Sequence, residues 1–99
     1  MFSFLSSIIT NLVLMEKTTF NKIFGEFVRE KRIHLKLSQS NLGDRMGLDY
    51  QYISRVERGL ISPTLFWIIG LSNAFELPLE LFIRDFVESS GINTLSIKV

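Results

Sequence analysis

Hydrogen-bonding and aromatic side chains gather in one short stretch of the sequence. Tyr50, Gln51, Tyr52 and Arg55 fall close together, and Arg58 follows them. A glutamine amide can bond adenine at two points, an arginine guanidinium can bond guanine in the same way, and tyrosine rings can meet thymine methyl groups or phosphates. We interpret the first four side chains as candidates for contact with DNA base edges and Arg58 as a candidate phosphate contact.

The residues around this stretch predict two short helices joined by a tight turn. Ser38 can cap the first helix by accepting a hydrogen bond from a backbone N–H. Gly47 can end it, because glycine adopts the left-handed conformation at little steric cost. Asp49 can cap the second helix, in which Ile53 and Val56 face inward. The candidate side chains are therefore expected on the outer face of the second helix.

Three segments of the chain follow the pattern of a known family in order and spacing. They are KRIHLKLSQ at 31–39, MGLDYQYISRVERG at 46–59 and SPTL at 62–65. From about Phe20 to Phe82 the chain resembles the helix-turn-helix proteins of the phage repressor and Cro (XRE-like) family, which includes the controller proteins of restriction-modification systems.

The resemblance implies a fold and a set of site residues. It implies an all-α, five-helix DNA-binding domain, with a structural ion pair between Arg32 and Glu57. It also implies that Gln39 contacts phosphate at a helix end, where backbone N–H groups favour an anion. We expect Ser38 to contact phosphate as well.

Composition argues against several classes of protein. The chain has 99 residues and no cysteine, so neither a disulfide framework nor a thiolate zinc site is available. Its one histidine, His34, has no second ligand residue at the spacing of a metal site. No nucleotide-binding or metalloprotease motif is present. We expect no catalytic residue, metal, cofactor or small-molecule ligand. Nothing argues for secretion, and a cytoplasmic location is expected.

The charge distribution agrees with a nucleic-acid partner. The formal net charge is only +1, but residues 16–60 carry nine Lys and Arg against six Asp and Glu. Residues 61–99 carry two against four. The basic half is the half that contains the two short helices, and its modest excess agrees with DNA binding.

A further helix should precede the pair. Apolar residues recur at three- and four-residue spacing, and Thr18 or Thr19 can cap the helix that they predict: Phe20, Ile23, Phe24, Phe27 and Val28. Lys36 lies between this helix and the next, where the family commonly has glycine. A lysine there must adopt a strained left-handed conformation or alter the turn.

Two more helices should follow the pair. Ser62 can cap the first, with Pro63 at its first position, and Pro78 can open the second. In the first of these helices, the side chains expected to face inward are Leu65, Ile68, Leu71, Ala74 and Phe75. Both helices then carry more apolar residues than one face can hold, which usually marks an interface. The predicted dimer interface comprises Phe66, Trp67, Ile69, Phe82 and Phe86. Alternatively, residues 1–14 or the C-terminal tail cover these residues within one chain.

The terminal segments differ from the central domain, which we place at residues 19–89. Residues 1–18 form an apolar N-terminal extension whose uncharged part, 1–14, is too short for a membrane span and lacks the basic start of a signal peptide. We expect residues 1–14 either to pack on the domain or on a second subunit, or to be an extension that precedes a natural start at Met15. Residues 90–99 form a tail in which alternating Leu95, Ile97 and Val99 favour a short β-strand.

The function that follows is regulation of transcription. A homodimer would place its two copies of the second short helix about 34 Å apart on double-stranded DNA and read a near-palindromic operator. The competing hypothesis is a protein-interaction module, such as an antitoxin-like partner, with a secondary role in DNA binding. The sequence leaves open the operator and whether the regulator activates or represses.

Overall fold

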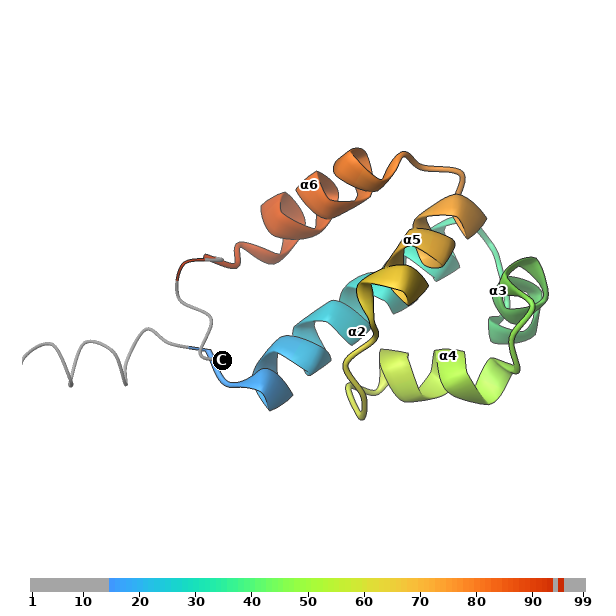
Figure 1. Ribbon diagram of the computed structural model, residues 1–99, viewed down its shortest axis with the longest axis horizontal. Helices are drawn as coiled ribbons and strands as arrows, with labels where there is room; N and C mark the ends of the chain where they lie inside the picture. The colour runs from blue at the N-terminus through green and yellow to red at the C-terminus, as the bar shows by residue number, and fades with distance from the viewer. Residues whose placement is uncertain (1–14, 94, 96–99) are drawn as a thin grey trace, which may run out of the picture.

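The computed structural model describes residues 15–93 and 95. The expectations for residues 1–14, and for the strand at 95–99 apart from Leu95, lie outside the described residues. The rest of the chain forms five helices (Figure 1), which are α2 Lys17–His34, α3 Gln39–Met46, α4 Tyr50–Glu57, α5 Leu65–Ala74 and α6 Leu79–Ser90. The predicted all-α, five-helix class is therefore confirmed.

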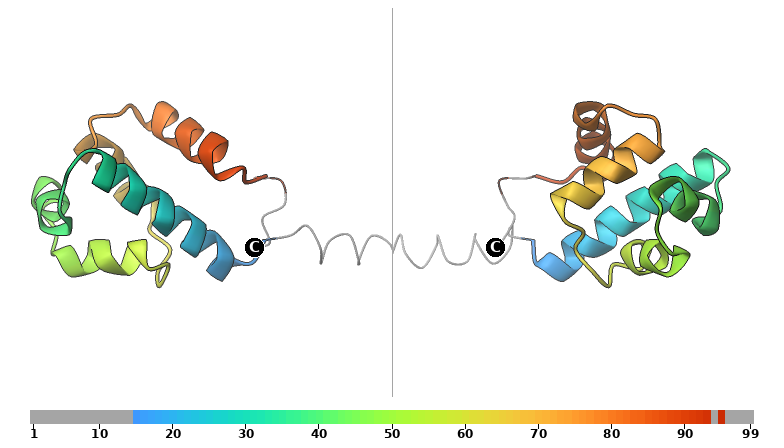
Figure 2. Two further views of the ribbon diagram at one scale, coloured as in Figure 1. Left: turned by 180° about the vertical axis from the view of Figure 1, so that it is seen from behind. Right: turned by 45° about the vertical axis from the view of Figure 1, so that its right-hand side comes forward.

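Helix α2 is the central element of the fold. It packs against α4 on one side and α6 on the other, while α5 contacts α3 and α6 (Figures 1 and 2). Its predicted apolar stripe is buried at Phe24, Phe27 and Val28. Phe24 meets Phe86 of α6 edge to face at 5.3 Å between ring centroids, and Phe27 lies 5.4 Å from Phe82. Aromatic pairs in this geometry stabilise a core beyond the area that they bury.

The predicted ends of α3 and α4 are confirmed. Ser38 Oγ accepts a hydrogen bond from the Asn41 backbone N–H at 2.9 Å, and Asn41 Oδ1 accepts one from the Ser38 N–H at 3.1 Å. Asp49 Oδ1 accepts from the Gln51 N–H at 2.8 Å. Gly47 ends α3 in the left-handed conformation, with φ of 67°. These contacts satisfy backbone groups that helix ends otherwise leave unpaired.

Two other predicted caps are wrong. Helix α2 begins at Lys17, so Thr18 and Thr19 lie inside its first turn rather than before it. Helix α5 is capped by Thr64, whose Oγ1 accepts from the Trp67 N–H at 3.2 Å. Ser62 is not the cap, because its hydroxyl donates to Asn21 Oδ1 and ties the preceding loop to α2.

The predicted burial of α5 and α6 requires correction. Leu71, Ala74 and Phe75 are buried as predicted, but Trp67 is buried and Leu65 is 64% exposed, so the first turn of α5 faces the core differently from the expectation. Phe82 and Phe86 are buried by the aromatic rings of α2. The assignment of Trp67, Phe82 and Phe86 to a dimer interface is therefore wrong, because these side chains form the core of the single chain.

Two helices end in residues that adopt the left-handed conformation without being glycine. Lys36 follows α2 and Glu76 follows α5, each with φ of 59°. The N–H of Lys36 donates to the Ile33 carbonyl, and the next N–H, of Leu37, donates to the Arg32 carbonyl. These paired bonds are the Schellman motif that glycine usually completes. The left-handed alternative expected for Lys36 is confirmed.

Within the part of the chain that the structure describes, no single helix is long and apolar enough to cross a membrane. Helices α5 and α6 reach that length and hydropathy only when taken together, across a bend of 96°.

Candidate nucleic-acid interface

The outward face of α4 carries the hydrogen-bonding side chains. Gln51 and Arg55 are exposed, and 49% of the surface of Tyr50 is exposed to solvent. Ile53 and Val56 point the other way and are fully buried. A helix with one apolar face anchored in the core presents its polar face as a rigid surface. Three of the four predicted base-contacting residues therefore share one exposed face.

Tyr52, the fourth predicted base-contacting residue, lies apart from the other three. Its ring packs against that of Trp67 in α5, with centroids 5.2 Å apart at a tilt of 46°, and the side chain is half-buried. An aromatic contact of this kind holds α4 against α5. The structure therefore places Tyr52 between the helices, at the margin of the exposed face.

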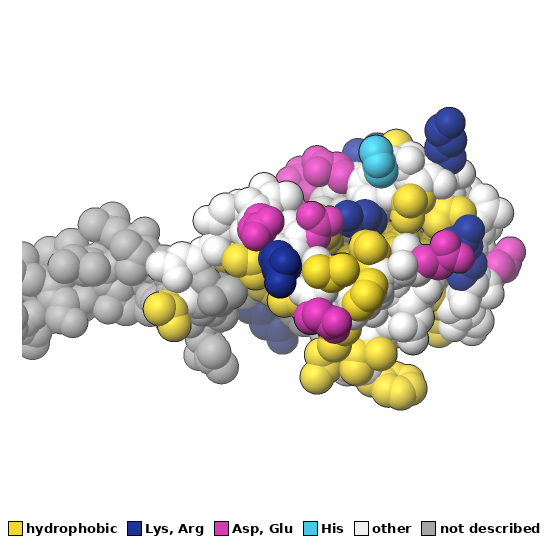
Figure 3. Space-filling model, turned by 90° about the horizontal axis from the view of Figure 1, so that it is seen from above, with side chains coloured by type: hydrophobic (Ala, Val, Ile, Leu, Met, Phe, Trp, Pro, Cys, Tyr) yellow, Lys and Arg dark blue, Asp and Glu magenta, His cyan; other side chains and the backbone are white. Residues whose placement is uncertain are grey.

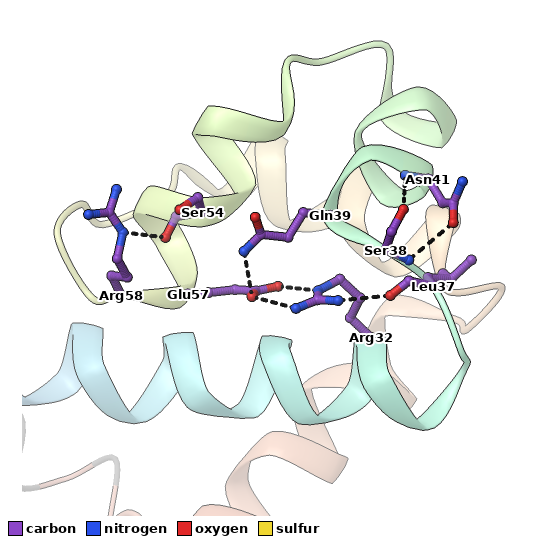
Figure 4. Close-up of polar contacts among 8 residues, drawn as sticks. All are labelled: Arg32, Leu37, Ser38, Gln39, Asn41, Ser54, Glu57 and Arg58. Carbon is purple, nitrogen blue, oxygen red and sulfur yellow. Dashed lines mark hydrogen bonds and ion pairs between the residues drawn. The ribbon is translucent and has the colours of Figure 1, made fainter.

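An ion pair between Arg32 and Glu57 fixes α4 against α2. Arg32 Nε donates to Glu57 Oε2 at 2.6 Å, and Nη2 donates to Oε1 at 3.0 Å (Figure 4). Both residues are buried. Arg32 Nη1 also donates to the Leu37 carbonyl at 2.8 Å, which fixes the segment leading into α3. This two-point geometry makes the arrangement of the three helices specific.

The N-terminal end of α3 lies beside the same carboxylate. Gln39 Nε2 donates to Glu57 Oε1 at 3.1 Å, so Gln39 is held against the C-terminal end of α4 (Figure 4). Its amide retains a second N–H, and the first backbone N–H groups of a helix attract anions. The hydroxyl of Ser38, which serves as the cap acceptor, still has its own proton to donate.

Arg58 lies at the C-terminal end of α4, as its position in the sequence indicated. Its Nε donates to the Ser54 carbonyl at 3.3 Å, one helical turn back (Figure 4). The residue is exposed, and four other guanidinium N–H donors remain. A cation at this end also complements the helix dipole.

Gly25 is a structural requirement of the site that sequence reasoning missed. A Cβ atom at this position would lie 2.3 Å from the Val56 carbonyl oxygen and 2.7 Å from that of Glu57. The backbones of α2 and α4 therefore touch directly at this point. The only signal in the sequence was a glycine inside an amphipathic helix, a pattern that often marks close packing.

A second exposed surface is apolar. Phe66 is 88% exposed and Ile69 is 39% exposed, as their assignment to an interface requires. The face formed by α6 carries further hydrophobic side chains between charged ones (Figure 3), and its exposed apolar residues include Leu81 and Ile83. Exposed apolar surface of this kind commonly marks an interaction site.

Comparison with known proteins gives matches over the same region. A helix-turn-helix family model matches residues 28–82. An uncharacterized transcriptional regulator in the ATPase CF(0) region of Rhodospirillum rubrum is 31% identical over 61 residues, which cover 62% of this chain and 56% of that protein. The crystal structure of the restriction-modification controller protein C.AhdI from Aeromonas hydrophila is similar with a TM-score of 0.59 at 34% identity. That match covers 63% of this chain and 94% of the controller protein.

Proposed function

Because the chain belongs to the helix-turn-helix family of transcriptional regulators, we propose that it binds a specific, near-palindromic DNA operator as a homodimer. A bound dimer that covers a promoter excludes polymerase, and one beside a promoter can recruit it. The similar protein from Aeromonas hydrophila is named a restriction-modification controller protein, which supports a regulatory role for this chain.

The exposed face of α4 is the observation that carries the proposal. A B-form major groove admits an α-helix, and the side chains presented there are an amide, a guanidinium and a phenol. We assign Gln51 and Arg55 to base edges and Tyr50 to a thymine methyl group or a phosphate. Tyr52 contributes less to base contact, because its ring is held against that of Trp67.

Phosphate contacts would set the register of α4 in the groove. We assign Ser38 and Gln39 to one such contact, since the N-terminal end of α3 presents backbone N–H groups and two side-chain donors. Arg58 supplies another contact at the far end of α4. Contacts of this type position a protein on the duplex, and base contacts supply its sequence preference.

The apolar surface of α5 supports the dimer. Phe66 and Ile69 lie outside the core, and covering them with a second copy would remove apolar area from water. Two copies related by a twofold axis would read two half-sites about 34 Å apart. One small module makes few base contacts, so pairing two of them raises both affinity and specificity.

Selection from a random pool of duplexes tests the proposal. The purified full chain is incubated with the pool at a stated salt concentration, and the mass of the complex is measured in parallel. A variant carrying Gln51→Ala and Arg55→Ala is the control, because both residues are exposed and the core stays intact. We expect a near-palindromic site bound by a dimer of the wild type and no such enrichment by the variant. A folded wild type that enriches no sequence would refute the proposal and favour the protein-interaction module.

A further inference from the structure

The first turns of α2 lie against the end of α4. A Cβ atom on Gly59 would lie 2.8 Å from both Cα and Cγ of Lys22. One turn further along α2, a Cβ atom on Gly25 would lie closer still, 2.3 Å from the carbonyl oxygen of Val56. The fold therefore brings the backbone of Lys22 into contact with the turn that follows Arg58.

The loop beyond this turn is also fastened to α2. The hydroxyl of Ser62 donates to the buried Asn21 Oδ1, next to Lys22 in sequence. Figure 1 shows this loop passing beside the N-terminal half of α2. Lys22 is thus held at a fixed place relative to α4, although the two are distant in sequence.

The charges at this end of α4 are predominantly positive. Lys22, Arg55 and Arg58 are all exposed. Lys22 takes part in neither of the ion pairs, Lys31–Asp85 and Arg32–Glu57, that join described residues. The carboxylate of Glu57 is buried and paired with Arg32, so it adds no negative charge to this surface. The basic surface of α4 therefore continues across Gly59 onto α2.

We propose that Lys22 is a further phosphate ligand, which binds the DNA backbone where it passes the C-terminal end of α4. A lysine ammonium is a mobile point charge on a flexible stem, and it binds phosphate oxygens without demanding one geometry. This inference rests on the proposed function, and it extends the DNA footprint from the two short helices onto α2.

The test measures the affinity of the full chain for its selected duplex and for a scrambled duplex over a range of salt concentrations. Lys22→Ala should weaken both complexes several-fold by the same factor. The slope of log affinity against log salt should fall by about 0.9 for each subunit bound. Lys22→Gln keeps most of the stem that packs on Gly59, and it should have the same effect. Arg84→Ala, which removes an exposed charge from α6, is the matched control and should leave the slope unchanged.

The possible results separate this inference from the proposed function. If the wild type selects a site and Lys22→Ala keeps the wild-type slope, the phosphate contact is refuted and the proposed function stands. A loss restricted to the selected site also refutes it, because a phosphate contact carries no sequence preference. If the folded wild type selects no DNA at all, both fail together.

Discussion

The carboxylate of Glu57 receives two hydrogen bonds from Arg32, at 2.6 Å and 3.0 Å, and both residues are buried. Removal of one partner leaves the other charged group buried, unpaired and out of contact with water. We expect Arg32→Ala to lower the free energy of unfolding by about 3–5 kcal/mol. Denaturation in urea measures this change.

The neighbouring pair supplies a matched control for that prediction. Lys31 pairs with Asp85, whose side chain is 48% exposed, whereas that of Glu57 is 3% exposed. Asp85→Ala should lower the free energy of unfolding by at most about 1 kcal/mol, because the long stem of Lys31 lets its ammonium group turn out into water once Asp85 is gone. Equal losses for the two variants would contradict the role given to burial.

The left-handed residues after α2 and α5 predict a gain in stability. Lys36→Gly and Glu76→Gly should each raise the free energy of unfolding by roughly 1 kcal/mol, since glycine adopts φ of 59° without the steric cost of a Cβ. Gly47→Ala makes the reverse change at φ of 67° and should lower it. Thermal unfolding of the three variants is the measurement. A loss of stability in both glycine variants would mean that no strain is present.

Two helical glycines, Gly25 in α2 and Gly70 in α5, should respond in opposite ways to replacement by alanine. Gly25→Ala should destabilise the domain by several kcal/mol, because a Cβ would lie 2.3 Å from a backbone carbonyl that cannot easily shift. At Gly70 a Cβ would meet only Met46 Cε, at 3.6 Å, so Gly70→Ala should raise stability by up to about 1 kcal/mol. Chemical denaturation distinguishes them, and similar effects at the two sites would contradict this packing.

Arg55 and Arg58 are expected to differ in their effect on sequence preference. Arg55→Ala should lower the affinity for the selected site by about 1–3 kcal/mol and affect random DNA far less. Arg58→Ala should weaken binding to both duplexes alike, as a phosphate contact does. Competition binding with labelled duplexes measures both ratios. Equal losses for Arg55→Ala would demote it to a phosphate contact.

The exposed ring of Phe66 predicts an effect on association alone. Phe66→Ser should weaken self-association, measured by sedimentation equilibrium, and leave the monomer folded, because 88% of the residue is exposed. Phe82→Ala is the contrast, since its fully buried ring should cost about 3–5 kcal/mol of stability when removed. Unchanged association of Phe66→Ser would move the interface elsewhere.

Local signals in the sequence were enough to predict much of the fold. Ser38, Gly47 and Asp49 act through the nearest backbone groups, so their roles follow from a few neighbouring residues. The contact between Arg32 and Glu57 joins residues far apart in sequence, and only the family resemblance pointed to it.

Errors arose where several orientations satisfy the same pattern. Helix α5, LFWIIGLSNA, is apolar almost all round, so periodicity could not determine that Trp67 faces inward and Leu65 outward. The hydrogen bond between Gln39 and Glu57 and the approach of Lys22 to Gly59 depend on how separate helices pack. No local pattern records such distances, and the structure alone supplied them.

Chemical-shift mapping of the labelled full chain with its selected duplex tests most directly whether α4 reads DNA. The largest amide shifts should occur at Ser38, Gln39 and residues 50–59, with smaller ones near Lys22. The Gln51→Ala and Arg55→Ala double variant should lose them at the same DNA concentration. Shifts confined to α5 and α6, with α4 unchanged, would contradict the account, because DNA would then be bound by the apolar surface instead.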